Sequence, residues 1–308
     1  MTGDTADKPS SHSVWPYLWM LCGAFAFAVM STLAHAVRDR FAWQTIAIGR
    51  SGVPFVLTAL SAGWAGGRLV VFGPRALWLR SVAGSTGLIC TFFALTRLPV
   101  ADALTLTNLF PIWIALLSWP LLRQRPGPFV WGCVVCAVCG VTLIQQPHLA
   151  DGNLATLAAL SASFTSALAM IGLHRVHGLD TRAIVWHFSG VSLVFAGVAL
   201  WLLDGRVPDK PLPPTSGSWL LLLGVGTSAT IGQFCLTKAF RMGVPSRVAV
   251  VGLTQVGFAL LFEVLFERRH YGTSSVLGML LVLAPTAWLL VCRRGANVEG
   301  PTSLSEAG

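Results

Sequence analysis

Charged side chains are scarce in this sequence. Only 11% of the 308 residues are Asp, Glu, Lys or Arg, and 54% are hydrophobic, whereas a soluble domain carries about 25% charged residues. An ordinary soluble domain is therefore excluded, and the composition is typical of an integral membrane protein. A transmembrane helix uses about 20 apolar residues, so ten helices would occupy roughly 200 residues and leave only short loops. No loop is then long enough to form a separate domain, which places the function among the helices.

The sequence also lacks the motifs of several enzyme classes. It contains no H-E-x-x-H, Walker A or Asp-rich isoprenoid-type motif, and no G-x-G-x-x-G that follows a strand. ATP-driven transport by this chain alone is excluded on that basis. Cys133, Cys136 and Cys139 are spaced as C-x2-C-x2-C, but positions three apart drift around a helix, and neither a fourth ligand nor a histidine lies in the segment. We interpret them as small packing residues, and the sequence predicts no metal site and no cofactor.

Apolar runs separated by Gly, Pro and charged residues predict an all-α integral membrane protein with ten transmembrane helices. The predicted spans cover residues 14–36, 42–64, 76–96, 101–122, 129–146, 152–173, 183–203, 218–240, 248–266 and 273–292. The connecting loops are short, so each span follows the previous one almost directly.

Basic residues cluster at the ends of these spans, which is a topology signal and not a nucleic-acid-binding stripe. With the N-terminus in the cytoplasm, twelve fall on the cytoplasmic side: Lys8, Arg68, Arg75, Arg80, Arg123, Arg125, Arg175, Arg182, Arg241, Arg247, Arg293 and Arg294. Seven fall on the opposite side: Arg38, Arg40, Arg97, Arg206, Lys210, Arg268 and Arg269. The bias predicts a multi-pass protein of the cytoplasmic (inner) membrane with both termini in the cytoplasm.

An internal repeat divides the sequence into two halves. Shifting the chain by 145 residues aligns Gly87–Ala94 with Gly232–Ala239, with three identities in eight positions. The simplest interpretation is two five-helix repeats over residues 14–146 and 152–292. Because five is odd, the second repeat must cross the membrane in the opposite sense. Inverted repeats of this kind are typical of secondary transporters, which bind substrate near the midplane between the halves.

Short motifs carry a resemblance to a known family. They are Arg50 in the second span, Phe93-Ala94-Leu95, the segment Leu98-Pro99-Val100-Ala101-Asp102-Ala103, Pro111, and Phe266-Glu267-Arg268. The chain resembles the drug/metabolite transporter (DMT) superfamily, EamA type, and its 98–103 segment is similar to the solute carrier 35G and S-adenosylmethionine-permease branch. The resemblance implies a ten-helix transporter. The first repeat has Arg123-Gln124-Arg125 where the family usually has a Glu. Any function that the family's Glu performs can therefore be performed only by the second repeat of this chain.

Ionisable and polar side chains within spans are the candidate site residues, because each is costly in a bilayer unless it faces a cavity or a partner. Arg50 is the clearest, since its guanidinium can hold a substrate carboxylate or phosphate bidentately; a fixed clamp within the bundle is the alternative. The other predicted substrate-binding residues are Asn108, Trp113, Gln233 and Gln255. For each of these, packing or hydrogen bonding between helices is the alternative. Glu263, about a turn inside the ninth span, is the candidate proton-coupling carboxylate, unless it pairs with Arg268 or Arg269.

The sequence thus predicts a secondary active transporter, either a permease or an exporter, that moves a small amino-acid-like or nucleoside-like metabolite by alternating access. The alternative is a membrane-embedded enzyme such as an acyltransferase or protease, and a sensor or scaffold is a third. An enzyme should show a cluster of nucleophile, base or metal ligands, and none is visible, so the protein is predicted not to be an enzyme. The expected partners are the substrate and the lipid bilayer. Coupling to protons, exchange for a counter-substrate, and a homodimer are left open.

Overall fold

Helices form nearly all of the described chain. The computed structural model describes residues 14–64, 69–95, 97–98, 100–146, 154–202, 213–267 and 272–291, and no strand occurs within these ranges. The helices within them are α1 (Trp15–Val37), α2 (Trp43–Trp64), α3 (Arg75–Leu95), α4 (Val100–Thr107), α5 (Phe110–Leu122), α6 (Pro128–Gln145), α7 (Leu154–His174), α8 (Thr181–Leu202), α9 (Ser216–Met242), α10 (Pro245–Gly252), α11 (Thr254–Glu267) and α12 (Thr273–Val291). The prediction of an all-α membrane protein is confirmed.

Among the described residues, nine stretches are long and apolar enough to cross a membrane, and Thr273–Leu289 is a tenth, shorter apolar helix. They correspond to the ten predicted spans. Two of the crossings consist of two helices each: α4 with α5, and α10 with α11. Each was predicted as one span. An interruption at Pro111 is expected because proline kinks or breaks a helix, whereas the break in the second stretch is a finding of the structure.

The first break follows from local chemistry. Pro111 cannot donate the backbone hydrogen bond that Thr107 would accept in a continuous helix. The Asn108 side chain turns back instead, and its Nδ2 donates to the carbonyl oxygen of Leu104 at 2.8 Å. The second break lies at Leu253, where no proline intervenes, and the Thr254 hydroxyl donates to the Val251 carbonyl at 2.7 Å. Residues 108 and 253 differ by the same 145 positions as the sequence match.

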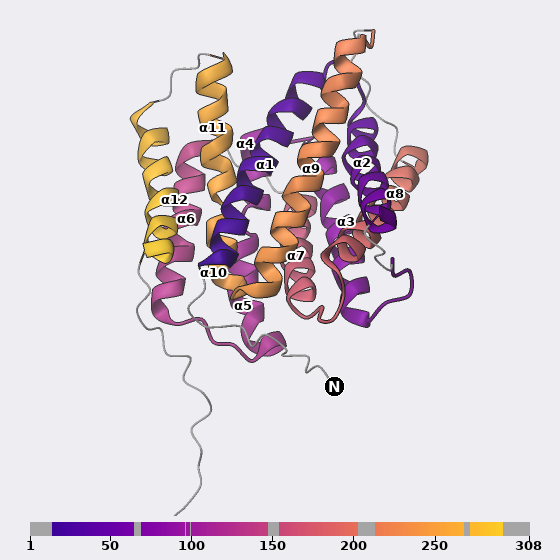
Figure 1. Cartoon of the computed structure of the whole chain (residues 1–308). Coiled ribbons are helices and arrows are strands. Elements are labelled where there is room, and N and C mark those ends of the chain that lie inside the picture. Colours follow the sequence, from indigo (N-terminus) through magenta and orange to yellow (C-terminus); the bar gives the residue numbers. More distant parts are fainter. Residues whose placement is uncertain are drawn as a thin grey trace, which may run out of the picture.

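Helices from the two halves pack side by side (Figure 1). The most extensive contacts join α1 with α9, α3 with α7, α2 with α8, and α6 with α12. Gly140 and Gly278 allow α6 and α12 to approach closely, because a Cβ atom on either would overlap the other's backbone oxygen. In the two repeats α1 corresponds to α7, α2 to α8, α3 to α9 and α6 to α12. Under this correspondence the α1–α9 pair is equivalent to the α7–α3 pair, and the α2–α8 and α6–α12 pairs are each equivalent to themselves. This pattern is consistent with the predicted inverted repeat.

Successive crossings alternate in direction, so the first turn of α1 and the last turn of α12 lie at the same end of the bundle (Figure 1). If that end faces the cytoplasm, as the basic residues indicate, a reporter fused after Gly308 should be active only if it is a reporter that functions in the cytoplasm. We expect a C-terminal alkaline phosphatase fusion to be inactive and a green fluorescent protein fusion to fluoresce. The reverse pattern would invert the predicted orientation.

Candidate functional site

Arg80 lies at the centre of a polar cluster inside the bundle. Its side chain extends from α3 and is only 2% exposed. Its Nη2 donates to Oε1 of Gln233 on α9 at 2.9 Å, and its guanidinium carbon lies 3.9 Å from the ring centre of Phe188 on α8. The Nε atom has no hydrogen-bond partner among the described residues. Arg80 therefore joins three helices and still offers a free N–H group.

Arg80 was predicted to be a topology signal at the cytoplasmic end of its span, and that prediction was wrong, because its side chain is buried inside the bundle. Arg80 lies five residues after the start of α3 at Arg75, more than one helical turn inside the bundle. Without Arg80, the bias of basic residues becomes eleven against seven. The position within the predicted span 76–96 was the available signal, because a charged residue more than one turn from a helix end is a candidate functional residue.

Arg50, predicted as a site residue, lies on α2 and is partly buried. It is close enough to Arg80 for their positive charges to repel each other. The one ion pair among the described residues joins Arg38 to Asp39, so no described carboxylate neutralises either Arg50 or Arg80. Two uncompensated guanidinium groups inside a membrane bundle are unfavourable alone and favour the binding of an anion.

Hydrogen bonds between α3 and α8 hold the Arg80 side of this cluster in place. Ser81 Oγ and His187 Nδ1 lie 2.7 Å apart, and the hydroxyls of Ser85 and Ser192 lie 2.8 Å apart. All four side chains are buried. Because both bonds lie within two turns of Arg80, the helix that carries its guanidinium is fixed relative to Phe188.

Gly84 provides the space that the Arg80 side chain occupies. A Cβ atom at this position would overlap Nη1 of Arg80 and lie 2.8 Å from the Phe188 ring. We therefore expect Gly84→Ala to displace the guanidinium and weaken anion binding at least about tenfold, the effect of losing one charge-assisted hydrogen bond. The matched control is Gly132→Ala on α6, where no atom lies within 4 Å of the added Cβ. Equal binding by the two variants in a titration would contradict this role of Gly84.

Gln233 and Arg50 are thus the predicted site residues that the structure brings to Arg80. Trp113 lies elsewhere, on α5, where its Nε1 donates to Ser163 Oγ of α7 at 3.0 Å. Asn108 and Gln255 flank the two breaks, and no hydrogen bond, ion pair or ring contact joins either to Arg80 in the described chain. The side chain of Glu263 lies outside the described residues.

One buried carboxylate was passed over as a site residue. Asp102, quoted from the sequence only as part of the 98–103 motif, lies in the first turn of α4 and is 1% exposed. Neither of its oxygens accepts a hydrogen bond from any described group. Its burial results from packing between α4 and the neighbouring helices α3, α6 and α7, which the sequence does not reveal.

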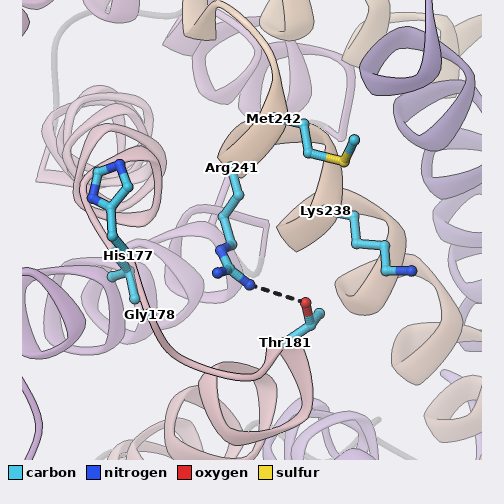
Figure 2. Close-up of a pocket in the computed structure, with 7 residues that line it drawn as sticks. His177, Gly178, Thr181, Lys238, Arg241 and Met242 are labelled. Carbon is cyan, nitrogen blue, oxygen red and sulfur yellow. Dashed lines mark hydrogen bonds between the residues drawn. The ribbon is translucent and has the colours of Figure 1, made fainter. Parts of the chain in front are cut away.

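A separate cavity of about 320 Å³ lies at the end of the bundle where α9 ends and the α7–α8 connection turns (Figure 2). Its basic lining residues are His177, Lys238 and Arg241. Arg241 Nη1 donates to Thr181 Oγ1 at 3.2 Å, whereas Lys238 extends in another direction (Figure 2) and places Nζ 4.4 Å from the Trp19 ring centre. All three basic side chains already have a hydrogen-bond or cation–π partner. Arg50, in contrast, makes no hydrogen bond or ion pair within the described chain, and Nε of Arg80 is unpaired.

Comparison with known proteins decides the family. The model of the EamA-like transporter family matches residues 14–145 and 153–291. The chain belongs to the EamA-like transporter family. As a member of this DMT-superfamily group it is a multi-pass membrane protein, and the family's character as transporters favours a transporter over an enzyme.

Relatives of this EamA-like chain include proteins named for the transport of two different compounds, pseudopaline and riboflavin. The pseudopaline exporter CntI of Pseudomonas aeruginosa (strain UCBPP-PA14) is 27% identical over 281 residues, covering 90% of this chain and 96% of the exporter. Human solute carrier family 35 member G1 is 24% identical and covers 86% of this chain and 76% of its own length. The riboflavin transporter of Vibrio cholerae is 24% identical, with coverage of 77% and 80%. One crystal structure has a TM-score of 0.75 at 18% identity and covers 93% of this chain and 100% of that chain, which supports the fold.

Proposed function

We propose that this EamA-like protein is a secondary active transporter that carries a small organic anion or zwitterion across the cytoplasmic membrane by alternating access. The observation that carries the proposal is the buried guanidinium of Arg80, whose Nε has no described partner, together with Arg50 on α2; neither arginine has a described carboxylate partner. Gln233 orients Arg80 through its hydrogen bond. A carboxylate satisfies these donors better than an uncharged group, which favours an amino-acid-like metabolite over a nucleoside-like one.

The arrangement of the helices supports movement of the two halves around this site. Arg50 and Arg80 come from the first half, whereas Phe188 and Gln233 come from the second. Discontinuous crossings such as α4–α5 and α10–α11 are a common element of secondary transporters. Asn108 and Gln255 flank these breaks, and with Trp113 they remain proposed contributors to substrate binding in another conformation. Both termini are proposed to lie in the cytoplasm, and exchange for a counter-substrate and a homodimer remain proposals.

A thermal-shift screen of the purified protein tests this function. The panel contains amino acids, nucleosides, S-adenosylmethionine and organic acids, and each compound that stabilises the protein is then used for counterflow in proteoliposomes. A ligand that binds only the folded state raises the melting temperature, so compounds with a carboxylate should stabilise the wild type and drive counterflow. The double variant Arg50→Gln/Arg80→Gln should show neither effect. The anion site would be contradicted if neutral compounds stabilised the wild type as much as carboxylates do, and if they stabilised the double variant to the same extent.

Glu263 is proposed to couple transport to protons. Glu263→Gln should then abolish accumulation driven by a proton gradient and leave equilibrative exchange largely intact, because the amide cannot carry a proton between the two sides. Uptake into proteoliposomes with and without an imposed pH gradient measures both activities. Asp102→Asn is the matched comparison, since Asp102 is the buried carboxylate of the first half. Normal gradient-driven uptake by Glu263→Gln would remove Glu263 from coupling, and its loss in Asp102→Asn would assign the role to Asp102.

A further inference from the structure

We infer that the substrate of this transporter carries two negative charges, as a dicarboxylate or a phosphate monoester does. The inference rests on the proposed function and concerns the same site. It follows from the charge of the cluster formed by Arg50, Arg80, Gln233 and Phe188, and from the hydrogen-bond donors that this cluster leaves free.

The charge balance is the first argument. Arg50 and Arg80 contribute two positive charges, and Gln233 and Phe188, the residues in contact with Arg80, are uncharged. His187 of α8 contacts the residue next to Arg80, and its Nδ1 is engaged with Ser81. A ligand with a single negative charge would leave one guanidinium uncompensated in a medium of low dielectric constant. A ligand with two negative charges compensates both and removes their mutual repulsion.

The free donors are the second argument. A guanidinium has five N–H donors. Within the described chain, Arg80 donates one hydrogen bond, to Gln233, and its Nε–H is unpaired. Arg50 makes no hydrogen bond or ion pair to any described residue, although it lies near Arg80. Each arginine therefore retains the paired donors that bind a carboxylate or phosphate bidentately. Phe188 covers one face of the Arg80 guanidinium, so the ligand must approach its edge.

Access to this cluster also favours a compact ligand. Arg80 is 2% exposed, and Gln233 and Phe188 are 7% exposed each. The charged groups of the ligand must therefore enter the bundle, where no bulk water replaces a missing ion partner. If the substrate had one negative charge, a second, separate anion would have to lose its hydration shell and bind as well. One molecule with two charged groups supplies both negative charges in a single binding event.

The experiment compares ligands that differ in one charge at nearly constant size. Dicarboxylates of three to six carbons are each titrated against their monomethyl esters, and glycerol 3-phosphate is titrated against its methyl phosphodiester, by isothermal calorimetry on the purified full-length protein at pH 7. At least one dianion should bind the wild type about tenfold or more tightly than its matched partner, the factor produced by one charge-assisted hydrogen bond. The dicarboxylates and the phosphate monoester separate the two sources of double charge.

The variants assign the effect to the two arginines. Arg50→Gln and Arg80→Gln should each reduce the preference for the dianion to about twofold or less, because one cation remains to bind one anionic group. Arg241→Gln, a matched arginine in the cavity at the end of α9, should leave the preference unchanged. Equal binding of diacid and monoester by the wild type would overturn the inference, while arginine-dependent binding of the monoester would leave the proposed anion transporter intact. If no member of the series binds, both the double-charge inference and the anion site are wrong.

Discussion

Replacing Arg80 by methionine is expected to reduce binding of the anionic substrate about 100-fold or more. The substitution removes the buried guanidinium, and a bidentate interaction with a charged group contributes about 3 kcal/mol, which corresponds to a factor of about 100. Methionine has a similar length and is apolar, so the space between α3, α8 and α9 stays filled. Equilibrium binding of a ligand from the screen measures the loss. The control, Arg241→Met, should bind normally.

Stability distinguishes a binding role of Arg80 from a structural one. Methionine alone would leave Gln233 Oε1 without its donor, so the stability test uses Arg80→Met with Gln233→Leu. Replacing both members of a buried polar pair by apolar groups is near neutral or stabilising, and removal of an uncompensated charge adds to the gain. We expect the ligand-free double variant to melt at or above the wild-type temperature. A marked decrease, together with intact substrate binding by Arg80→Met, would assign Arg80 to the structure.

Arg50→Ala is expected to weaken substrate binding about 100-fold without unfolding the bundle. Arg50 makes no hydrogen bond or ion pair within the described chain, so its removal breaks no polar contact between helices. Size-exclusion profiles in detergent should match those of the wild type. Loss of the folded peak would mean that Arg50 stabilises the bundle, and unaltered binding would remove it from the site.

Arg50→Lys separates the requirement for charge from the requirement for geometry. Lysine keeps the positive charge but presents a single ammonium in place of the planar fork. We expect a loss of about tenfold, intermediate between wild type and alanine, because one of two parallel hydrogen bonds is lost. The same binding assay measures it. Full retention of affinity by lysine would show that only the charge matters.

The fold was largely predictable because membrane insertion imposes a simple rule on the sequence. The ten apolar runs and their short connections indicated the crossings, and Pro111 marked where the fourth one is interrupted. The break at Leu253 has no such residue. Gly252 packs closely against Met20, where an added Cβ atom would lie 3.0 Å from Met20 Cε. That contact joins residues more than 200 positions apart, and it appears only once the helices are assembled.

The site was predictable in part, for a related reason. Arg50 was predicted as a site residue because a charged side chain deep within a transmembrane span is costly unless it faces a cavity or a partner. Arg80 lies nearer to the end of its helix, where a long basic side chain commonly reaches the membrane surface. Its inward direction depends on the space beside Gly84, on Phe188 and on Gln233, which belong to three helices. Trp113 was recognised as an aromatic inside a span, but its hydrogen bond to Ser163 depends on how α5 meets α7.

The most direct test of the Arg50–Arg80 site is saturation binding of a radiolabelled anionic ligand to the purified protein, compared across wild type, Arg50→Gln, Arg80→Gln and the double variant. All four proteins must first give the same monodisperse profile in detergent. We expect saturable binding by the wild type, a rise in Kd of at least about tenfold in each single variant, and no saturable binding in the double variant. Wild-type affinity in the double variant would contradict the assignment of Arg50 and Arg80 to the substrate site.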